Sequence, residues 1–363
     1  MRILFITGSY PPVKCGVGDY VSILSSMLAK HEHCRLAVLT GRESATGDIG
    51  SGVTVFPAMA CWRFKEFVEI FRIVRQWRPD VIHIQYPTKG YGKSKMPLFL
   101  PFLLSKLPVK IIQTWHEPLG FWRRLRYLPC ALTRDHLIVV EPDYYKFLPD
   151  WYAWLLRQKR IFRYIPVGTN IPAVRLDRSE QAEIRATLGI HGKRMVAYFG
   201  FAIPSKRVED IFDISDPDND RIVLICDLHS ADSYHQKLLG LVNNETWRGK
   251  VFVTGFLKSE EVARLLAASD VGIFPFATGV TSRNASVLAA RSQGAFVLTT
   301  SYNKHGYSAD EHTYYAEPGN IKEMRQAVAD YAGKSRSSAM NLPPDWDFIV
   351  AEHIRLYHDV LKN

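Results

Sequence analysis

The sequence predicts an α/β protein with two doubly wound domains, each a parallel sheet covered by helices on both faces. Short runs rich in β-branched residues alternate with longer helix-compatible stretches, which is the order of βαβ units. The alternation occurs as two series on either side of a segment with proline and glycine, 163–172, which we expect to be a hinge. A length of 363 residues also suits two domains better than one core. We therefore expect domains at 1–167 and 168–344.

The expected strands are the short apolar runs. In the first series they are Arg2–Thr7, Arg35–Thr40, Val53–Phe56, Val81–Gln85, Lys110–Thr114 and His136–Val140. In the second series they are Met195–Phe199, Arg221–Cys226, Val251–Thr254, Val271–Pro275, Phe296–Thr300 and Thr313–Ala316. Helices are expected between them, for example at Val21–Lys30 and Glu260–Ala268. Because ligands of open α/β sheets lie beyond the carboxyl ends of the strands, we expect the active site there, between two facing domains.

The composition predicts a cytoplasmic protein that does not span a membrane. The five cysteines are widely spaced and form no C-x-x-C pair, which favours reduced thiols over a disulfide framework or a zinc site. The apolar start of the chain is too short for a signal peptide and indicates a first buried strand. The best membrane candidate, Met96–Val109, is interrupted by three prolines and a lysine, and a spanning helix needs ~20 apolar residues.

The net charge of +10 is concentrated in the first half of the chain. Residues 1–165 hold 24 Lys and Arg against 12 Asp and Glu, whereas the rest of the chain holds 22 against 24. Many of these cations are interleaved with aromatic residues, at 62–65, 75–78, 121–127 and 151–163, which suits a phospholipid headgroup layer. We expect an anionic membrane surface as a partner, with ordinary amphipathic helices as the alternative. No nucleic-acid partner is expected, because no typical RNA- or DNA-binding motif is present.

The first expected strand leads into a loop that contains Gly16 and Gly18, just before a helix. Glycine lets the backbone approach a ligand closely, and exposed N–H groups at a helix start favour phosphate, whereas a plain turn is the alternative. A dinucleotide site would need G-x-G-x-x-G tight against the strand, but these glycines lie eight and ten residues beyond Gly8. The spacing therefore argues against a dehydrogenase.

Two further candidates follow expected strands. His116 comes directly after the Lys110–Thr114 region, at a carboxyl strand end where a side chain can enter a cleft; a structural histidine is the alternative. Lys206 lies in the loop Gly200–Arg207, before a helix. A cation there can neutralise a leaving pyrophosphate, the largest charge that develops when a sugar–phosphate bond breaks, whereas a solvated loop is the alternative.

The most informative segment runs from Phe274 to Gly294. It combines a strand end, a loop of small residues, a hydroxyl-rich helix start, an Ala- and Leu-containing helix and a closing glycine. Together these features predict an anion-binding helix N-terminus, although a capped core helix is the alternative. The candidate phosphate-binding residues are Gly279, Thr281, Ser282, Asn284 and Ser286.

No metal site is expected from the residue pattern. Asp213, Asp216, Asp218 and Asp220 form an acidic cluster, but a proline and an asparagine among them indicate a solvated turn between a helix and a strand. The histidine pairs His31 and His33, and His229 and His235, lack cysteine or carboxylate partners at a zinc-like spacing.

The order of these motifs resembles glycosyltransferase family 4, whose members are retaining, metal-independent enzymes with the two-domain GT-B fold, over nearly the whole chain. In the first half the matching segments are Tyr10-Pro11-Pro12 with Gly16-Val17-Gly18, Asp80-Val81-Ile82-His83, Thr114-Trp115-His116 and Ile165-Pro166-Val167-Gly168. In the second half they are Gly200 to Lys206, Val253-Thr254-Gly255-Phe256 and Ala268-Ser269-Asp270-Val271 leading into Pro275. The resemblance implies two Rossmann-like domains facing each other across a cleft, with a helix at 345–363 packing back on the first.

The sequence departs from the family at two places. The family's paired glutamates would fall on Thr281 and Ala289, and the arginine that often follows the glycine of the lysine loop is Phe201 here. The segment instead resembles a bacterial subgroup without these glutamates, which it matches at Gly279, Val280, Thr281, Arg283, Ser286, Leu288, Ala289, Ala290 and Gly294. Arg283 is therefore our hypothesis for the missing positive charge.

The resemblance implies a hexosyltransferase that works with retention, without a cofactor and without a metal. Its donor would be a nucleotide diphosphate sugar, UDP- or GDP-linked, and its acceptor a glycan or a lipid-linked precursor in bacterial cell-surface polysaccharide or lipopolysaccharide synthesis. The expected location is the cytoplasm, peripheral at the inner face of the cell membrane. The implied catalytic residues are His116, Lys206 and Arg283.

The remaining implied site residues divide into two groups. The donor contacts are Gly16, Gly18, Phe256 and the five residues of the helix start named above. The acceptor-side residues are Asp19, Tyr20 and Tyr86. Two other functions stay open: a nucleotide-sugar epimerase, which would need acid and base carboxylates, and a non-catalytic partner or glycan-binding subunit, which the missing glutamates suggest.

Overall fold

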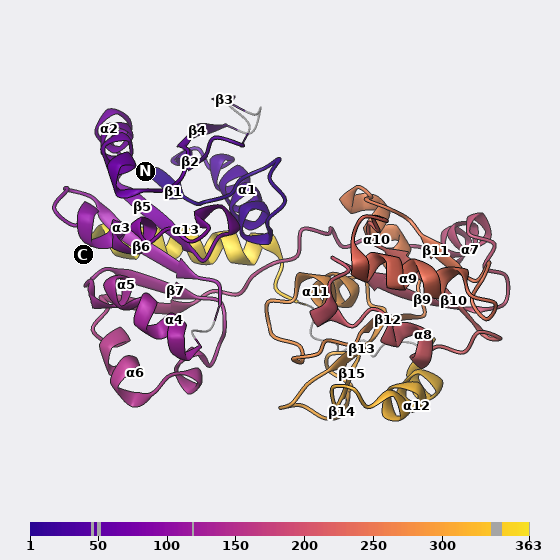
Figure 1. The fold of residues 1–363 in the computed structure, drawn as a ribbon. Coiled ribbons are helices and arrows are strands. Elements are labelled where there is room, and N and C mark those ends of the chain that lie inside the picture. Colours follow the sequence, from indigo (N-terminus) through magenta and orange to yellow (C-terminus); the bar gives the residue numbers. More distant parts are fainter. Residues whose placement is uncertain (45–46, 49–51, 118–119, 335–342, 363) are drawn as a thin grey trace. The chain divides into compact units, whose positions relative to one another are not determined.

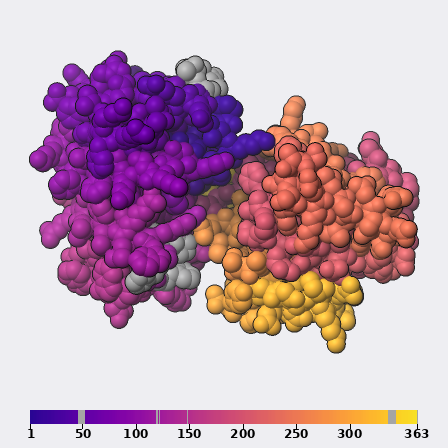
Figure 2. All heavy atoms as spheres, viewed as in Figure 1, coloured from indigo at the N-terminus to yellow at the C-terminus, as the bar shows by residue number. Residues whose placement is uncertain are grey.

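The computed structural model describes residues 1–44, 47–48, 52–117, 120–334 and 343–362. The chain divides into two compact units (Figure 1): unit 1 is Met1–Gly168 with Pro344–Asn363, and unit 2 is Thr169–Pro343. Side chains fill the space around the ribbon in each unit (Figure 2). Unit 1 is thus built from two separate stretches of the sequence, whereas unit 2 is one continuous stretch.

Unit 1 has a sheet of eight strands within the described residues, in the order β3-β4-β2-β1-β5-β6-β7-β8. The strands are β1 (Arg2–Ile6), β2 (Arg35–Gly41), β3 (Gly47–Asp48), β4 (Val53–Met59), β5 (Val81–Tyr86), β6 (Lys110–Trp115), β7 (His136–Val139) and β8 (Ile161–Tyr164). Neighbours are parallel except for β3 and β4. In the centre, Leu4 lies opposite Ala37 and Ile82. These strands are continuous apolar runs because helices cover both faces of the sheet.

Two apolar cores lie on the two faces of this sheet. The helices of unit 1 are α1 (Gly16–Ala29), α2 (Phe67–Trp77), α3 (Met96–Leu104), α4 (Phe121–Arg126), α5 (Leu128–Leu132), α6 (Asp150–Leu156) and α13 (Trp346–Lys362), with the 3₁₀ turns η1 (Phe64–Glu66), η2 (Lys89–Tyr91) and η3 (Tyr144–Phe147). Buried side chains of α1 and α13 form one core, and those of α2, α3, α5 and α6 form the other. Asn363, the last residue of the expected C-terminal helix, lies outside the described residues.

Unit 2 has a seven-stranded sheet within the described residues, in the order β11-β10-β9-β12-β13-β15-β14, antiparallel only at β14 and β15. The strands are β9 (Arg194–Phe199), β10 (Asp220–Ile225), β11 (Val251–Val253), β12 (Val271–Phe274), β13 (Phe296–Thr300), β14 (Gly306–Ser308) and β15 (Thr313–Ala316). The helices are α7 (Arg178–Thr187), α8 (Asp210–Ile214), α9 (Ser233–Asn243), α10 (Ser259–Ala267), α11 (Ala285–Ser292) and α12 (Ile321–Tyr331), with η4 (Pro204–Lys206).

The structure contains every expected strand and adds β3, β8 and β14. All three additions lie at or beside a sheet edge and are short, so they lack the long apolar run that marks a buried strand. The first helix begins at Gly16, five residues before the expected start at Val21, so both loop glycines belong to its first turn.

The acidic cluster at 213–220 corrects one expectation. Asp220 is fully buried at the start of β10, where Arg194 donates two hydrogen bonds of 2.7 and 3.0 Å to its carboxylate. The backbone N–H of Asp216 also donates to Asp220, at 2.7 Å. Part of the cluster is therefore a buried ion pair that closes the loop between α8 and β10, rather than a solvated turn.

Candidate functional site

The loop that carries Lys206 follows β9, which lies between β10 and β12 in the sheet of unit 2. The loop begins at Gly200, whose φ of +135° is a value that residues other than glycine rarely adopt. The Tyr198 hydroxyl donates to the carbonyl of Phe201 at 2.8 Å, and the N–H of Ala277 donates to the carbonyl of Ser205 at 3.1 Å. The second bond ties this loop to the segment after β12, so two strand ends are held together.

Lys206 ends η4 with its ammonium group over an aromatic ring. Its Nζ lies 3.8 Å from the ring centroid of Phe276, a residue that is 2% exposed. Burial, together with the positive charge of Arg283, lowers the pKa of Lys206 to about 8. Among the described residues, no carboxylate lies within ion-pair distance of Nζ. Two cations therefore lie close together without a neutralising acid at the lysine.

The start of α11 is the second part of this cluster. Asn284 is the N-cap residue, but its side chain makes no capping bond to the helix. Its Oδ1 instead accepts from the backbone N–H and the hydroxyl of Thr281, at 2.7 and 3.0 Å. Gly279 has φ of +75°, and a Cβ there would lie 3.3 Å from Ser301 Cα. The first turn of α11 thus keeps backbone N–H donors that its cap residue does not satisfy.

The remaining candidates of unit 2 lie around this turn. Ser286 is close to Gly200, because a Cβ on that glycine would lie 3.6 Å from Ser286 Cβ. Ser282 is exposed, and Arg283 is half-buried. Phe256 is 78% exposed and follows Gly255, which has φ of +71°. The structure therefore groups Lys206, Arg283 and the α11 start, while Phe256 lies on the loop after β11 with most of its side chain exposed.

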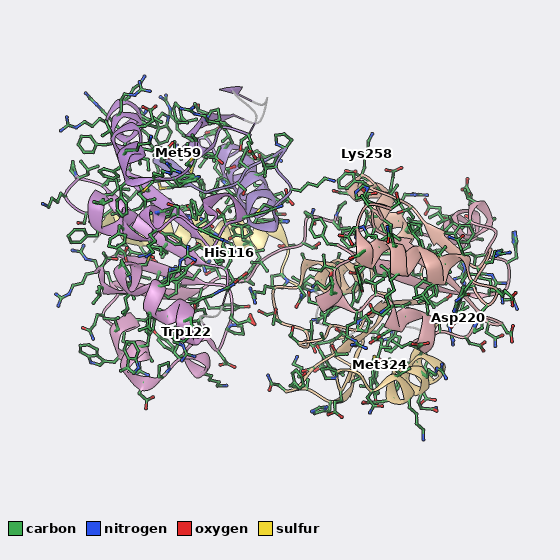
Figure 3. The ribbon with its side chains drawn as sticks, viewed as in Figure 1. Met59, His116, Trp122, Asp220, Lys258 and Met324 are labelled. Carbon is green, nitrogen blue, oxygen red and sulfur yellow. The ribbon has the colours of Figure 1, made fainter. Side chains whose placement is uncertain are left out.

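In unit 1 the main candidate is His116, labelled in Figure 3, directly after β6. Its side chain is 6% exposed, and its Nε2 lies 2.8 Å from Oε1 of Gln85, at the end of β5. Its ring also contacts the ring of Tyr20 edge-on, at a centroid distance of 5.0 Å. His116 and Tyr20, which were expected as a catalytic and an acceptor-side residue, are therefore direct neighbours.

The other unit 1 candidates have different surroundings. Gly16 is exposed, and a Cβ there would meet nothing within 4 Å. Gly18 is buried, and a Cβ there would lie 2.9 Å from the carbonyl oxygen of Ser9, so its role is close packing. Asp19 is half-buried, and burial raises its pKa. Tyr86 is fully buried, with its hydroxyl donating to the carbonyl of Pro97, which gives an acceptor contact no support.

Sequence reasoning missed three residues of these two clusters: Gln85, Phe276 and His353. Gln85 is, with His83, one of two buried polar residues in a mostly apolar strand, which is a usable signal. Phe276 is one apolar residue among many, and the contact of His353 with Tyr20 joins positions 333 residues apart. Neither carries a local signal.

Two features of the described residues bear on partners. They contain no group of three or more His, Cys, Asp or Glu side chains arranged to hold a metal ion. None of their helices is long and apolar enough to cross a membrane.

No family model and no curated protein matches this sequence. Solved structures do resemble it along its whole length. Sucrose-phosphate synthase from Thermosynechococcus elongatus has a TM-score of 0.76 at 16% identity, covering 100% of this chain and 99% of the other. A glycosyltransferase from Rickettsia africae has a TM-score of 0.75 at 12% identity, with coverage of 100% and 99%. HepE from Anabaena, in complex with UDP and glucose, has a TM-score of 0.71 at 14% identity, with coverage of 99% and 100%. With two parallel-sheet α/β units, the chain has the GT-B fold.

Proposed function

We propose that this protein is a glycosyltransferase that moves a sugar from a nucleotide diphosphate donor to a glycan or lipid-linked acceptor. The observation that carries the proposal is the cation pair of unit 2. Lys206 and Arg283 lie close together, no carboxylate neutralises the lysine within the described residues, and the uncapped start of α11 lies beside them. Two cations and a helix N-terminus favour a ligand with at least two negative charges, such as a pyrophosphate.

The proposed roles follow from the chemistry of a departing nucleoside diphosphate. Lys206, Arg283 and the N–H groups of the α11 start stabilise the charge that develops on its phosphates. Phe256 offers an aromatic face to the base. His116 of unit 1 contacts the donor sugar. The reaction proceeds with retention and without a metal, and the leaving phosphate accepts the proton of the acceptor hydroxyl, so that catalysis consists of orientation and electrostatics.

The first experiment is a thermal-shift screen against UDP, GDP, ADP, CMP and their common sugar conjugates. A ligand at 100 times its Kd adds ~2.7 kcal/mol of stability, so binding is easily detected. We expect a shift with one nucleotide diphosphate, and UDP comes first because HepE was solved with it. Lys206→Ala should lose the shift, whereas Lys322→Ala, an exposed lysine on α12, should keep it. No shift with any nucleotide would contradict the proposal.

An anionic membrane surface at the inner face of the cell membrane is the proposed location of the reaction. Four large apolar side chains are exposed on two helices that both pack against α5: Trp122 and Leu125 on α4, and Trp151 and Trp154 on α6, at 47–79% exposure. Trp122 is labelled in Figure 3. Exposed arginines lie on or next to the same helices, at 123, 126, 157 and 160. Tryptophan beside arginine suits the headgroup layer of an anionic bilayer.

Flotation with vesicles containing phosphatidylserine tests this location. We expect the protein to float with anionic vesicles at low salt and to be released at high salt. Trp151→Ser with Trp154→Ser should abolish flotation, whereas Phe348→Ser, a half-exposed aromatic on α13, should not. Sedimentation of the wild-type protein without the vesicles at low salt would overturn the membrane proposal while leaving the transferase proposal intact.

A non-catalytic GT-B subunit is the second candidate, and one observation favours it. Ala289, where the related enzymes carry the second glutamate, is fully buried in α11 and has no polar group. Nucleotide binding without sugar transfer or hydrolysis, over a panel of acceptors, would support this candidate. Release of a free epimerised nucleotide sugar would instead support the epimerase.

A further inference from the structure

The loop that carries Lys206 is held by the start of α9 as well as by the segment after β12. It needs such support, because Arg207, directly after Lys206, has φ of +48°, a value that residues other than glycine rarely adopt. The start of α9 is itself fixed by Asp232, whose carboxylate accepts from the backbone N–H groups of Tyr234 and His235, at 2.8 and 3.1 Å. Two neighbouring side chains therefore reach the loop from a fixed helix start.

His235 holds the loop near its beginning. Its Nε2 lies 2.8 Å from the carbonyl oxygen of Ala202, which can only accept a hydrogen bond, so Nε2 carries the proton. Its Nδ1 accepts from the backbone N–H of His229, at 3.0 Å. Both partners are backbone groups, whose donor and acceptor roles are fixed, and together they define one tautomer of the ring. His235 thereby connects the loop after β9 to the loop after β10.

Tyr234 holds the same loop at its end. Its hydroxyl accepts from the backbone N–H of Val208, at 2.9 Å, and donates to the carboxylate of Glu209. Lys237, three residues further along α9, pairs with the same carboxylate at 3.0 Å. The two attachments to α9 lie on either side of Lys206 in the sequence, so α9 contacts both ends of the segment that carries the ammonium group.

We infer that His235 is a positioning residue for Lys206, because its bond to the Ala202 carbonyl holds the lysine where a nucleotide diphosphate binds. This inference rests on the proposed function of Lys206. A cation stabilises a departing phosphate only from a preorganised position, and a displacement of ~1 Å can cost ~10²-fold in rate. The bond at Nδ1 goes to the loop after β10 instead, so its loss should matter less to the lysine. The two ring nitrogens can therefore be tested separately.

Two amide substitutions separate the two nitrogens. Glutamine places an amide N–H near the position of Nε2, whereas asparagine places an amide oxygen near that of Nδ1. Each variant loses one hydrogen bond, so urea unfolding should give the two similar stabilities. We expect His235→Gln to bind the nucleotide diphosphate within about twofold of the wild type, and His235→Asn to bind it about tenfold more weakly. Equal affinities of the two variants, or tighter binding by His235→Asn, would overturn the inference.

A double-mutant cycle tests whether His235 acts through Lys206. In the wild-type background, His235→Asn should lower turnover by roughly 10- to 100-fold. In the Lys206→Ala background, the same substitution should change turnover by less than about threefold. His229→Ala keeps the backbone N–H that His235 accepts from, so as a control it should leave turnover unchanged. Equal effects of His235→Asn in the two backgrounds would show that it does not act through the lysine.

Failure of the proposed function has a different signature. Absence of nucleotide binding in the wild-type protein would refute that function and, with it, the ligand of Lys206. Hydrogen exchange of residues 200–208 tests the attachment of the loop itself. Exchange there should be faster in His235→Asn than in His235→Gln, because only the glutamine keeps the donor to Ala202. Equal exchange rates would show that Nε2 does not hold this loop.

Discussion

Two lysines, one in each unit, have opposite surroundings. Lys159 of unit 1 is fully enclosed, with its ammonium group on the Asp135 carboxylate and on the carbonyls of Cys130 and Thr133, at 2.7 and 2.8 Å. Lys206 of unit 2 is half-buried over the Phe276 ring, and its nearest charge effect comes from another cation, Arg283. Burial lowers the pKa of both lysines, but Asp135 opposes the effect at Lys159 while Arg283 adds to it at Lys206.

The difference separates a lysine that serves the fold from one that we propose serves a ligand. The charge of Lys159 is satisfied within the protein, where it joins the turn between α6 and β8 to the end of α5 and the turn before β7. The charge of Lys206 is not satisfied by an acid among the described residues, so it costs stability until an anion arrives. Burial alone would have placed both lysines in one class, and only their partners distinguish them.

Lys159→Met should have the largest effect on stability. The substitution leaves Asp135 buried without its cation, which typically costs about 3–5 kcal/mol. Urea unfolding of the variant measures this loss. Asp135→Leu combined with Lys159→Met removes both charges and should recover much of the stability. A single variant as stable as the wild type would show that Asp135 is neutral in the folded protein.

Lys206→Ala should not destabilise the protein as Lys159→Met does, but it should reduce activity. We expect a free energy of unfolding equal to or above that of the wild type, because a buried charge without an acid partner is removed. Turnover should fall by ~10²–10³-fold, the usual loss when one preorganised charge-stabilising group is removed. Initial rates with the donor found in the thermal-shift screen measure it. Near wild-type turnover would remove Lys206 from the site.

Arg283→Gln should have an intermediate effect. Loss of the guanidinium raises the pKa of Lys206, so the lysine stays charged to higher pH, while one charged contact to the diphosphate is lost. A hydrogen bond to a charged group is worth about 1.5–3 kcal/mol, which corresponds to a weakening of nucleotide binding by roughly 10- to 100-fold. Isothermal titration calorimetry measures it, with Arg264→Gln on α10 as the control. Unchanged affinity would confine Arg283 to a structural role.

The pH dependence should be the smallest effect and the most specific to Lys206. The lowered pKa of about 8 means that the unfolded chain binds more protons than the folded one from about pH 8 to the ordinary lysine range. Stability should therefore rise with pH across that window, and Lys206→Met should remove the rise. Nucleotide diphosphate affinity should fall over the same window, by at most about tenfold per pH unit, and Lys206→Arg should flatten that fall. Affinity that increases with pH would contradict the assignment.

The fold could be predicted from the sequence because buried parallel strands are local apolar runs. β1 and β9 are examples, as each is apolar on both faces and is followed by a helix. The strand β8 could not be found in this way, because its residues are only partly buried at a sheet edge. Its residues also fall in two segments that we interpreted otherwise, the aromatic and basic stretch 151–163 and the expected hinge 163–172.

The candidate site could be predicted only where polar or charged residues follow an expected strand in the local sequence. Lys206 and the start of α11 follow strands and carry polar groups, so the sequence predicts both as candidates. The pairing of Lys206 with Phe276 and of His116 with Gln85 depends on which strands are neighbours in the sheet, which a single sequence does not state. Tyr86 is a counterexample to this kind of prediction. It also lies at a strand end, but its side chain is buried in the core.

The position of α13 in the sequence, after the whole of unit 2, affects how unit 1 folds during synthesis. It supplies Ile349, Leu356 and Tyr357 to the face of the first sheet that α1 also covers. A ribosome therefore releases the first unit with part of this face bare, and the cover arrives only after all of Thr169–Pro343 has been synthesised. The second unit, one uninterrupted stretch, can close its core earlier. Translation that stops before residue 344 leaves a complete second unit joined to a first unit that lacks α13. Chaperones and proteases can then reach the uncovered apolar face, which includes Ile3 and Phe5.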